Sequence, residues 1–298
     1  MVIQAQIIRN NSLIPEKDWV AHIQHLREAV GHGSKDAVKR ALVAAVRKRI
    51  PQQPFGIFFS GGVDSSLIAL LCAKEQATCY AVGFQGEGME MPPDILAARK
   101  VASFLGIRLV EKVFTEKEIE PIIKRAISIL PKPLIDEIDA DYVVKIGVAS
   151  VVIAAAGLAK EKIFFSGLGS EEIFAGYERH VKADDVNTEC WNGLLKMWQR
   201  DLVRDAAVGK ELGITVLTPF LDPDVIIGAM RIPGDKKIIG EHKKAILREI
   251  AEELGLPHEM AWRKKQGAQY GSRFDKALEK LAKMNGFRYR KEYLTSLL

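Results

Sequence analysis

The stretch FGIFFSGGVDSS, residues Phe55–Ser66, decides the fold. The apolar run FGIFF predicts a buried strand, and the segment Val63–Gln76 has the composition of a helix. A strand, a glycine-rich turn and a helix together form the arrangement that binds phosphate. Glycines let the main chain approach the anion, and free N–H groups point at it from the helix start. The hydroxyls of Ser60, Ser65 and Ser66 add hydrogen-bond donors.

Asp64 is the unexpected member of this loop. A carboxylate beside phosphate is repulsive unless a cation lies between them, so Asp64 predicts a Mg²⁺ ion. The spacing fits neither GxxxxGK[ST] nor GxGxxG. A plain capped turn, with Asp64 favouring the helix dipole, is the alternative interpretation. The complete pattern SGGxDSS after an apolar strand is more specific than that and favours phosphate binding.

Short apolar runs and helical stretches alternate on both sides of this loop. Two amphipathic helices are predicted before it, one around Trp19 and one after a possible cap at Ser34. The alternation predicts an α/β fold with a parallel sheet covered by helices on both faces.

No strand is predicted after about residue 180. The predicted division is 1–50, an N-terminal helical segment; 51–183, the α/β nucleotide-binding core; and 184–298, a mainly helical part that completes the active site. The strands are predicted over residues 55–59, 78–84, 107–114 and 162–166, and the helices after the loop over 63–76, 94–106, 116–130 and 141–160.

Composition restricts the class of protein. The 298 residues carry 43 Lys+Arg against 38 Asp+Glu, a surplus of +5 that permits a polyanionic partner without requiring one. The three cysteines form no CxxC pair and the six histidines are scattered, so a zinc site is not expected. No signal peptide is visible, and the most apolar stretch, 146–159, is too short for a membrane span. A cytoplasmic protein with reduced thiols and no membrane partner is expected.

A second strand–loop–helix segment, KIFFSGLGSEEIFAGYERH, runs from Lys162 to His180. Both loops should lie at the carboxyl ends of parallel strands, where α/β sheets bind ligands. The first loop resembles that of the PP-loop ATP pyrophosphatases. The second resembles the SGxGSDE(x)FGGY signature of the asparagine synthetase catalytic domain. Three further segments agree with that family in the same order: YAVGF at 80–84, LTPFLDPDVI at 217–226 and HKKAILREIAEELGLPHEMAWRKKQG at 242–267.

The resemblance implies an ATP- and Mg²⁺-dependent, AMP-forming amide ligase, a carbon–nitrogen ligase of the asparagine synthetase type. A carboxylate, with aspartate favoured, would attack the α-phosphorus and release pyrophosphate, and ammonia or another amine would attack the acyl-adenylate. Lys265 would stabilise the departing pyrophosphate, although a lysine within RKK is also typical of a solvated surface. The resemblance implies the following sites: Lys265 and Glu172, catalytic; Phe59, Ser60, Gly61, Gly62, Asp64, Ser65, Ser66, Val82, Ser166 and Gly167, ATP-binding; Asp64 and Glu171, metal-binding.

The sequence also departs from that family. Leu168 stands where asparagine synthetases have a glutamate that can orient or deprotonate the amine. Glu171 replaces an aspartate, and Ala175 replaces a glycine. About 50 residues precede the first loop, too few for a glutaminase domain, so free ammonia or a separate glutaminase subunit is expected as the nitrogen source. A homodimer is left open.

Two alternatives remain at this point. One is a PP-loop ligase that modifies tRNA, suggested by basic and aromatic residues in the segment 273–293. The same segment has an apolar stripe of helical spacing, which favours a docked amphipathic helix and makes a nucleic-acid partner less expected. The other is a protein that binds ATP or AMP without ligase activity, suggested by Leu168.

Overall fold

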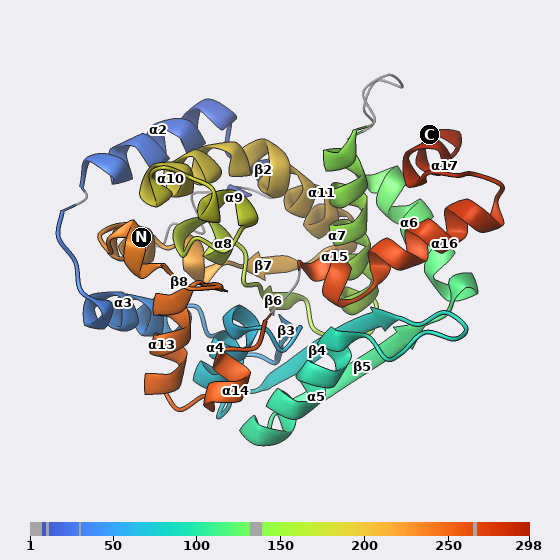
Figure 1. Ribbon diagram of the computed structural model, residues 1–298. Coiled ribbons are helices and arrows are strands. Elements are labelled where there is room, and N and C mark those ends of the chain that lie inside the picture. Colours follow the sequence, from blue (N-terminus) through green and yellow to red (C-terminus); the bar gives the residue numbers. More distant parts are fainter. Residues whose placement is uncertain (1–7, 10–11, 30, 132–138, 265–266) are drawn as a thin grey trace.

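A five-stranded parallel sheet forms the centre of the protein (Figure 1). The computed structural model describes residues 8–9, 12–29, 31–131, 139–264 and 267–298. The strand order is β5-β4-β3-β6-β7, and every neighbouring pair is parallel. The predicted α/β fold class is therefore confirmed. The strands are β3 (Phe55–Phe58), β4 (Ala77–Phe84), β5 (Arg108–Phe114), β6 (Ile163–Phe165) and β7 (Thr215–Leu217).

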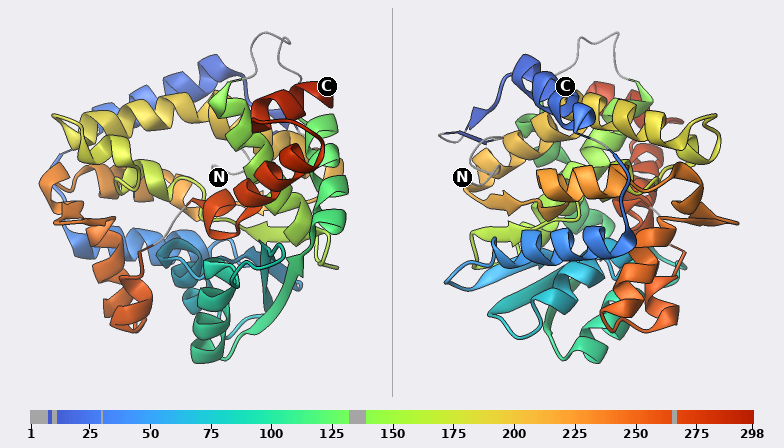
Figure 2. Two further views of the ribbon diagram at one scale, coloured as in Figure 1. Left: turned by 45° about the vertical axis from the view of Figure 1, so that its right-hand side comes forward. Right: turned by 90° about the vertical axis from the view of Figure 1, so that its left-hand side faces the viewer.

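Helices cover both faces of the sheet, as the views in Figures 1 and 2 show. The central strands carry apolar side chains on both sides, because successive residues of a strand point to opposite faces. In β6, Phe164 belongs to one hydrophobic core and Phe165 to the other. All eight residues of β4 are buried. This double burial explains why the strands have continuous rather than alternating apolar sequences.

The helices fall close to their predicted positions. Ser34 caps α3, its hydroxyl accepting a hydrogen bond from the Ala37 N–H, and Gly106 ends α5 in the left-handed conformation with φ 62°. A proline inside a helical sequence predicts an interruption, but α6 is continuous through Pro121. The longer helices are α2 (Glu16–Glu28), α3 (Lys35–Arg47), α4 (Val63–Leu71), α5 (Pro93–Leu105), α6 (Glu116–Ile129), α7 (Ala140–Ala156), α10 (Val186–Met197), α11 (Val203–Leu212), α12 (Pro223–Met230), α13 (Ala245–Glu253), α16 (Phe274–Met284) and α17 (Arg290–Ser296).

Short elements connect these helices. A π-helical turn, η2, joins α10 to α11. The hairpin of β8 and β9 leads directly into α13. The short elements are β1 (Ile8–Arg9), β2 (Ser12–Leu13), α8 (Ser170–Ile173), α9 (Glu178–Val181), η2 (Trp198–Leu202), η3 (Pro219–Leu221), η4 (Gly234–Lys236), β8 (Ile238–Ile239), β9 (His242–Lys243), α14 (His258–Ala261) and α15 (Ala268–Gly271).

The expectation that strands stop near residue 180 is wrong. β7 comes from the segment 211–223, whose sequence indicates an irregular crossing, and it pairs with β6 in the same sheet. A three-residue strand at the sheet edge is too short to show an apolar period. The division of the chain at residues 50 and 183 stays a prediction, and the last part contributes a strand to the sheet of the middle part.

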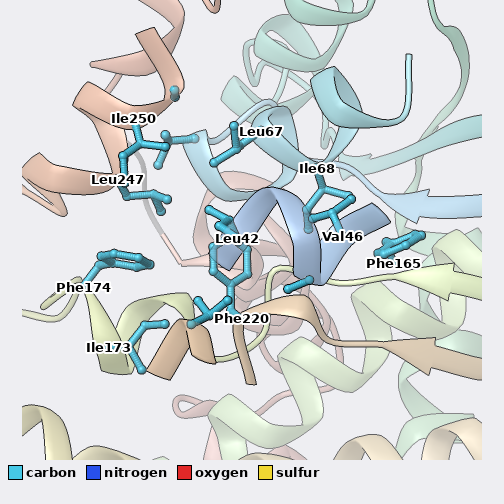
Figure 3. Packing of buried hydrophobic residues seen from close by; sticks show 14 of the residues in the cluster. Leu42, Val46, Leu67, Ile68, Phe165, Ile173, Phe174, Phe220, Leu247 and Ile250 are labelled. Atoms are coloured by element: carbon cyan, nitrogen blue, oxygen red, sulfur yellow. The ribbon is translucent and has the colours of Figure 1, made fainter. Parts of the chain in front are cut away.

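One core fixes the elements that carry the two glycine-rich loops. Side chains of α3, α4, β6, α8, η3 and α13 converge there, among them Leu42, Leu67, Phe174, Phe220 and Leu247 (Figure 3). Close packing of this kind resists small displacements. The starts of α4, α8 and α13 are therefore held in fixed relation to one another.

Helix α16, the last but one in the chain, docks on the other core. Its apolar stripe of Phe274, Ala277, Leu278 and Leu281 is buried, which confirms the interpretation as a docked amphipathic helix. Within the described residues, no helix is both long and apolar enough to cross a membrane.

Candidate active site

The first glycine-rich loop is held in a fixed shape by its own serines. The Ser65 hydroxyl donates to the Gly62 carbonyl oxygen at 3.2 Å, and the Ser60 N–H donates to the Ser65 hydroxyl at 3.3 Å. Gly61 has φ +63°, and a Cβ there would lie 2.5 Å from the main chain of Ala97. Only glycine fits this position, so the sequence SGG is required for the loop to form.

The second loop lies against the first. A Cβ on Gly167 would lie 2.9 Å from the Cβ of Asp64, so glycine permits the close approach. The Ser166 N–H donates to the Leu217 carbonyl oxygen of β7, and the Ser166 hydroxyl accepts from the Leu168 N–H at 3.2 Å. The two motifs, about a hundred residues apart in sequence, thus form one site at the ends of the neighbouring strands β3 and β6.

Lys244 joins the acidic residues of the two loops. Its Nζ lies 2.8 Å from Asp64 Oδ1, 2.9 Å from Asp64 Oδ2 and 2.7 Å from Glu171 Oε1. The Ser170 hydroxyl lies 3.1 Å from the same nitrogen. Asp64 and Glu171 were predicted to share a cation, and the structure brings them together around an ammonium group.

Burial strengthens these ion pairs. The side chains of Lys244 and Asp64 are 5% and 4% exposed. Burial alone would lower the pKa of Lys244, but the carboxylates of Asp64 and Glu171 outweigh that effect and raise it above its ordinary value. Lys244 is therefore charged throughout the neutral pH range.

The site suits a Mg²⁺ ion bound together with a polyphosphate. Mg²⁺ is typically held by one or two carboxylates with phosphate oxygens and water. Asp64 and Glu171 supply two such carboxylates, and both contact the same nitrogen, Lys244 Nζ. Among the residues described, no three His, Cys, Asp or Glu side chains form a complete metal cage.

Arg263 connects the first loop to the segment after α13, and Arg248 connects that segment to the chain before α13. The Arg263 guanidinium donates to the Ser60 carbonyl oxygen at 3.1 Å and to Asp94 at 2.9 Å. Arg248 is buried and donates to the carbonyl oxygens of Lys243, Ala261 and Arg263. Arg248 therefore positions both the chain at Lys244 and the chain at Arg263.

The predicted nucleotide contacts of Phe59 and Val82 lie beside the loop. The Phe59 N–H donates to the Tyr80 carbonyl oxygen, and the Phe84 N–H donates to the Ser272 carbonyl oxygen. Because strand residues alternate, the main chain of Val82 faces the same side as those of Tyr80 and Phe84. β3 has already ended there, and the nucleotide contacts of Phe59 and Val82 stay predictions.

Two other residues singled out in the sequence, Ser66 and Leu168, pack against buried parts of the protein. Ser66 is completely buried in α4, and Lys265 lies outside the described residues. Leu168 is partly buried and packs against the hydrophobic core. The binding and catalytic roles of these residues stay predictions.

Glu172 faces away from the cation site into a charged network. Its carboxylate, 1% exposed, accepts a hydrogen bond from Arg200, which also pairs with Asp201. Burial, reinforced by Asp201, raises the pKa of Glu172 above its usual range. The geometry favours a structural contribution, while a catalytic role for Glu172 stays a prediction.

Sequence reasoning underestimated Lys244 and passed over Arg248. From the sequence, Lys243 or Lys244, near the start of a helix, could equally reach phosphate or lie on the surface. The signal was present in the K-x-x-x-R spacing, because Lys244 and Arg248 lie one helical turn apart at the start of α13. Burial of a lysine cannot be read from such spacing alone.

We expect Gly176→Ala to destabilise the protein by roughly 1–3 kcal/mol, the usual cost of overpacking. A Cβ at Gly176 would lie 1.6 Å from Glu171 Oε2 and 2.4 Å from Lys244 Cε, so it would displace both groups. The matched change is Ala175→Gly. Ala175 has φ +58°, so strain relief would offset the lost methyl burial and leave stability nearly unchanged. Urea unfolding of both variants checks the pair, and equal losses would contradict it.

Sequence comparison identifies the family and the relatives of this chain. The sequence profile of the family described as asparagine synthase matches residues 37–187 and 181–290. A putative glutamine-hydrolysing asparagine synthetase of Methanocaldococcus jannaschii is 30% identical over an alignment 308 positions long, which covers 89% of this chain and 54% of the relative. Asparagine synthetase B of Escherichia coli is 31% identical over 271 residues, which cover 84% of this chain and 45% of the relative. The chain spans about half the length of the curated relatives it matches.

Proposed function

The chain belongs to the asparagine synthase family, and from that premise we propose that it is an ATP- and Mg²⁺-dependent, AMP-forming amide ligase. It would activate a carboxylate as an acyl-adenylate, release pyrophosphate and pass the acyl group to ammonia or another amine. Aspartate is the favoured carboxylate, because the relatives are named as asparagine synthetases. A separate glutaminase subunit or free ammonia would supply the nitrogen in the cytoplasm.

One observation carries this proposal. Asp64 and Glu171, each in a glycine-rich loop at the end of its own strand, meet on the Lys244 ammonium group. A protein that merely binds a nucleotide needs phosphate-binding amides. Convergent carboxylates suit a metal-assisted departure of pyrophosphate.

The residues of the chain divide the first step between them. Main-chain amides and serines of the first loop would bind the departing pyrophosphate. Asp64 and Glu171 would hold Mg²⁺, which neutralises charge on the phosphate oxygens when it is bound. Arg263 keeps the loop in place through the Ser60 carbonyl oxygen. As the carboxylate oxygen forms its bond to the α-phosphorus, the bond from phosphorus to the bridging oxygen breaks and pyrophosphate leaves.

The second step uses a different part of the site. The amine attacks the acyl carbon, AMP leaves and the amine loses a proton. Leu168 supplies no base for that proton, because it stands where the family has a glutamate and its side chain packs against the core. We therefore infer that the amine attacks in its neutral form and that another group, either the phosphate of the departing AMP or solvent, accepts the proton it loses.

We expect ATP–pyrophosphate exchange only in the presence of an accepted carboxylate. Labelled pyrophosphate would return to ATP when the acyl-adenylate forms reversibly, with no amine present. A panel of carboxylates that includes aspartate identifies the substrate, and addition of ammonia then tests amide formation. ATP–pyrophosphate exchange in the absence of any carboxylate would contradict the proposed formation of an acyl-adenylate. Tight ATP binding without exchange would instead favour a nucleotide-binding protein that lacks ligase activity.

A further inference from the structure

We propose that Lys244 is a resident counter-ion that occupies the Mg²⁺ position until a polyphosphate binds. In this state the protein keeps free Mg²⁺ out of the carboxylate pair, and the ammonium group moves to phosphate oxygens when the metal enters with its nucleotide. The inference deepens the proposed function, because it concerns the same site and rests on it. Lys244 is thus a positioning residue that couples metal binding to nucleotide binding.

The contacts of Lys244 are those expected of such an ion. One nitrogen contacts three carboxylate oxygens at 2.7–2.9 Å and one hydroxyl at 3.1 Å. These acceptors come from both glycine-rich loops, so the ammonium group lies at the point where a shared metal would be bound. A Mg²⁺ ion with ligand distances near 2.1 Å cannot occupy the same point as the nitrogen.

Burial and backbone geometry hold the lysine in place. Its side chain is 5% exposed, and its backbone adopts the left-handed conformation with φ +59°. Gly176 leaves the space through which the stem passes, since a Cβ there would lie 2.4 Å from Lys244 Cε. The neighbouring Lys243 differs in every respect: its side chain is 31% exposed and it pairs with Glu178 at the surface.

The electrostatic balance explains why Mg²⁺ replaces the Lys244 ammonium group only when a polyphosphate is present. With Lys244 in place, two carboxylates face one buried cation, and a divalent ion must displace it at a cost in charge repulsion. A polyphosphate provides new anionic oxygens for the ammonium group, so the lysine can leave the carboxylates without losing its counter-charges. Metal and polyphosphate should therefore bind with positive coupling.

The test measures Mg²⁺ binding by calorimetry without nucleotide or carboxylate substrate. We expect wild-type protein to bind Mg²⁺ weakly alone and more tightly with inorganic pyrophosphate. Lys244→Met should bind Mg²⁺ alone about tenfold or more tightly than wild type, because the competing charge is gone. Pyrophosphate should then raise the Mg²⁺ affinity by a smaller factor than it does in wild type, because only its own ligand oxygens still contribute. Lys243→Met is the matched control and should behave as wild type.

Two further variants make the result decisive. Lys244→Gln keeps a hydrogen-bond donor near the carboxylates and should show the same gain if Lys244→Met fails to fold. Asp64→Asn combined with Lys244→Met should abolish the gain, because a metal ligand is lost. Equal Mg²⁺ affinity in wild type and the Lys244 variants would overturn the inference. This readout needs no adenylation, so a failure of the proposed function in the exchange assay is distinguishable from a failure here.

Discussion

Replacing Asp64 by asparagine is expected to reduce the rate of ATP–pyrophosphate exchange by roughly 100- to 1,000-fold, the usual effect of removing one electrostatic contact to a transition state. Asparagine has nearly the same shape, so the close approach to Gly167 is kept. The carboxylate that would hold Mg²⁺ and that pairs with Lys244 is lost. We therefore expect a slower chemical step with an intact fold.

The matched control for Asp64→Asn is Glu178→Gln. Glu178 also pairs with a lysine of this segment, Lys243 at 2.8 Å, but on the surface. Steady-state exchange kinetics with the accepted carboxylate, together with thermal unfolding, separate an effect on activity from one on stability. Exchange at the wild-type rate in a folded Asp64→Asn protein would remove Asp64 from the reaction.

Local chemistry predicted the central part of the fold from sequence. The strand before Ser60 and the helix after Gly62 follow from an apolar run that stops at two glycines, and the structure contains both. Gly106 marked the end of α5 in the same way. These signals are readable because each depends on a few adjacent residues.

Features set by distant contacts could not be read in this way. β7 is a three-residue strand that pairs with β6 at the edge of the sheet formed by the described residues, so nothing in its own sequence distinguishes it from a loop. Glu172 and Glu171 are adjacent in an acidic pair, yet they face different partners, Arg200 and Lys244. Which of the two carboxylates faces the site depends on the orientation of the short helix α8. Two adjacent glutamates in a sequence do not indicate that orientation.

Asp222 shows how a motif recognised for function can be required for stability. It lies in the LTPFLDP segment, and its side chain is 2% exposed. Its carboxylate pairs with Arg49 at 2.7 Å and with Lys48 at 2.6 Å, both at the end of α3. It also caps α12 by accepting a hydrogen bond from the Asp224 N–H. This one side chain therefore connects α3, α12 and the turn after β7.

We expect Asp222→Ala to lower the free energy of unfolding by about 3–5 kcal/mol, because it leaves the Arg49 guanidinium buried without this carboxylate. Lys48 can turn to solvent, but the Arg49 side chain is 2% exposed and cannot. Loss of the helix cap adds about 1 kcal/mol. Urea unfolding measures the change.

The matched control is Asp224→Ala, which removes an exposed carboxylate from the same helical turn and should lower the free energy of unfolding far less. Asp222→Ala combined with Arg49→Met should recover part of the loss, since no buried charge then faces the missing carboxylate. Equal effects of Asp222→Ala and Asp224→Ala would show that the buried pair contributes little to stability.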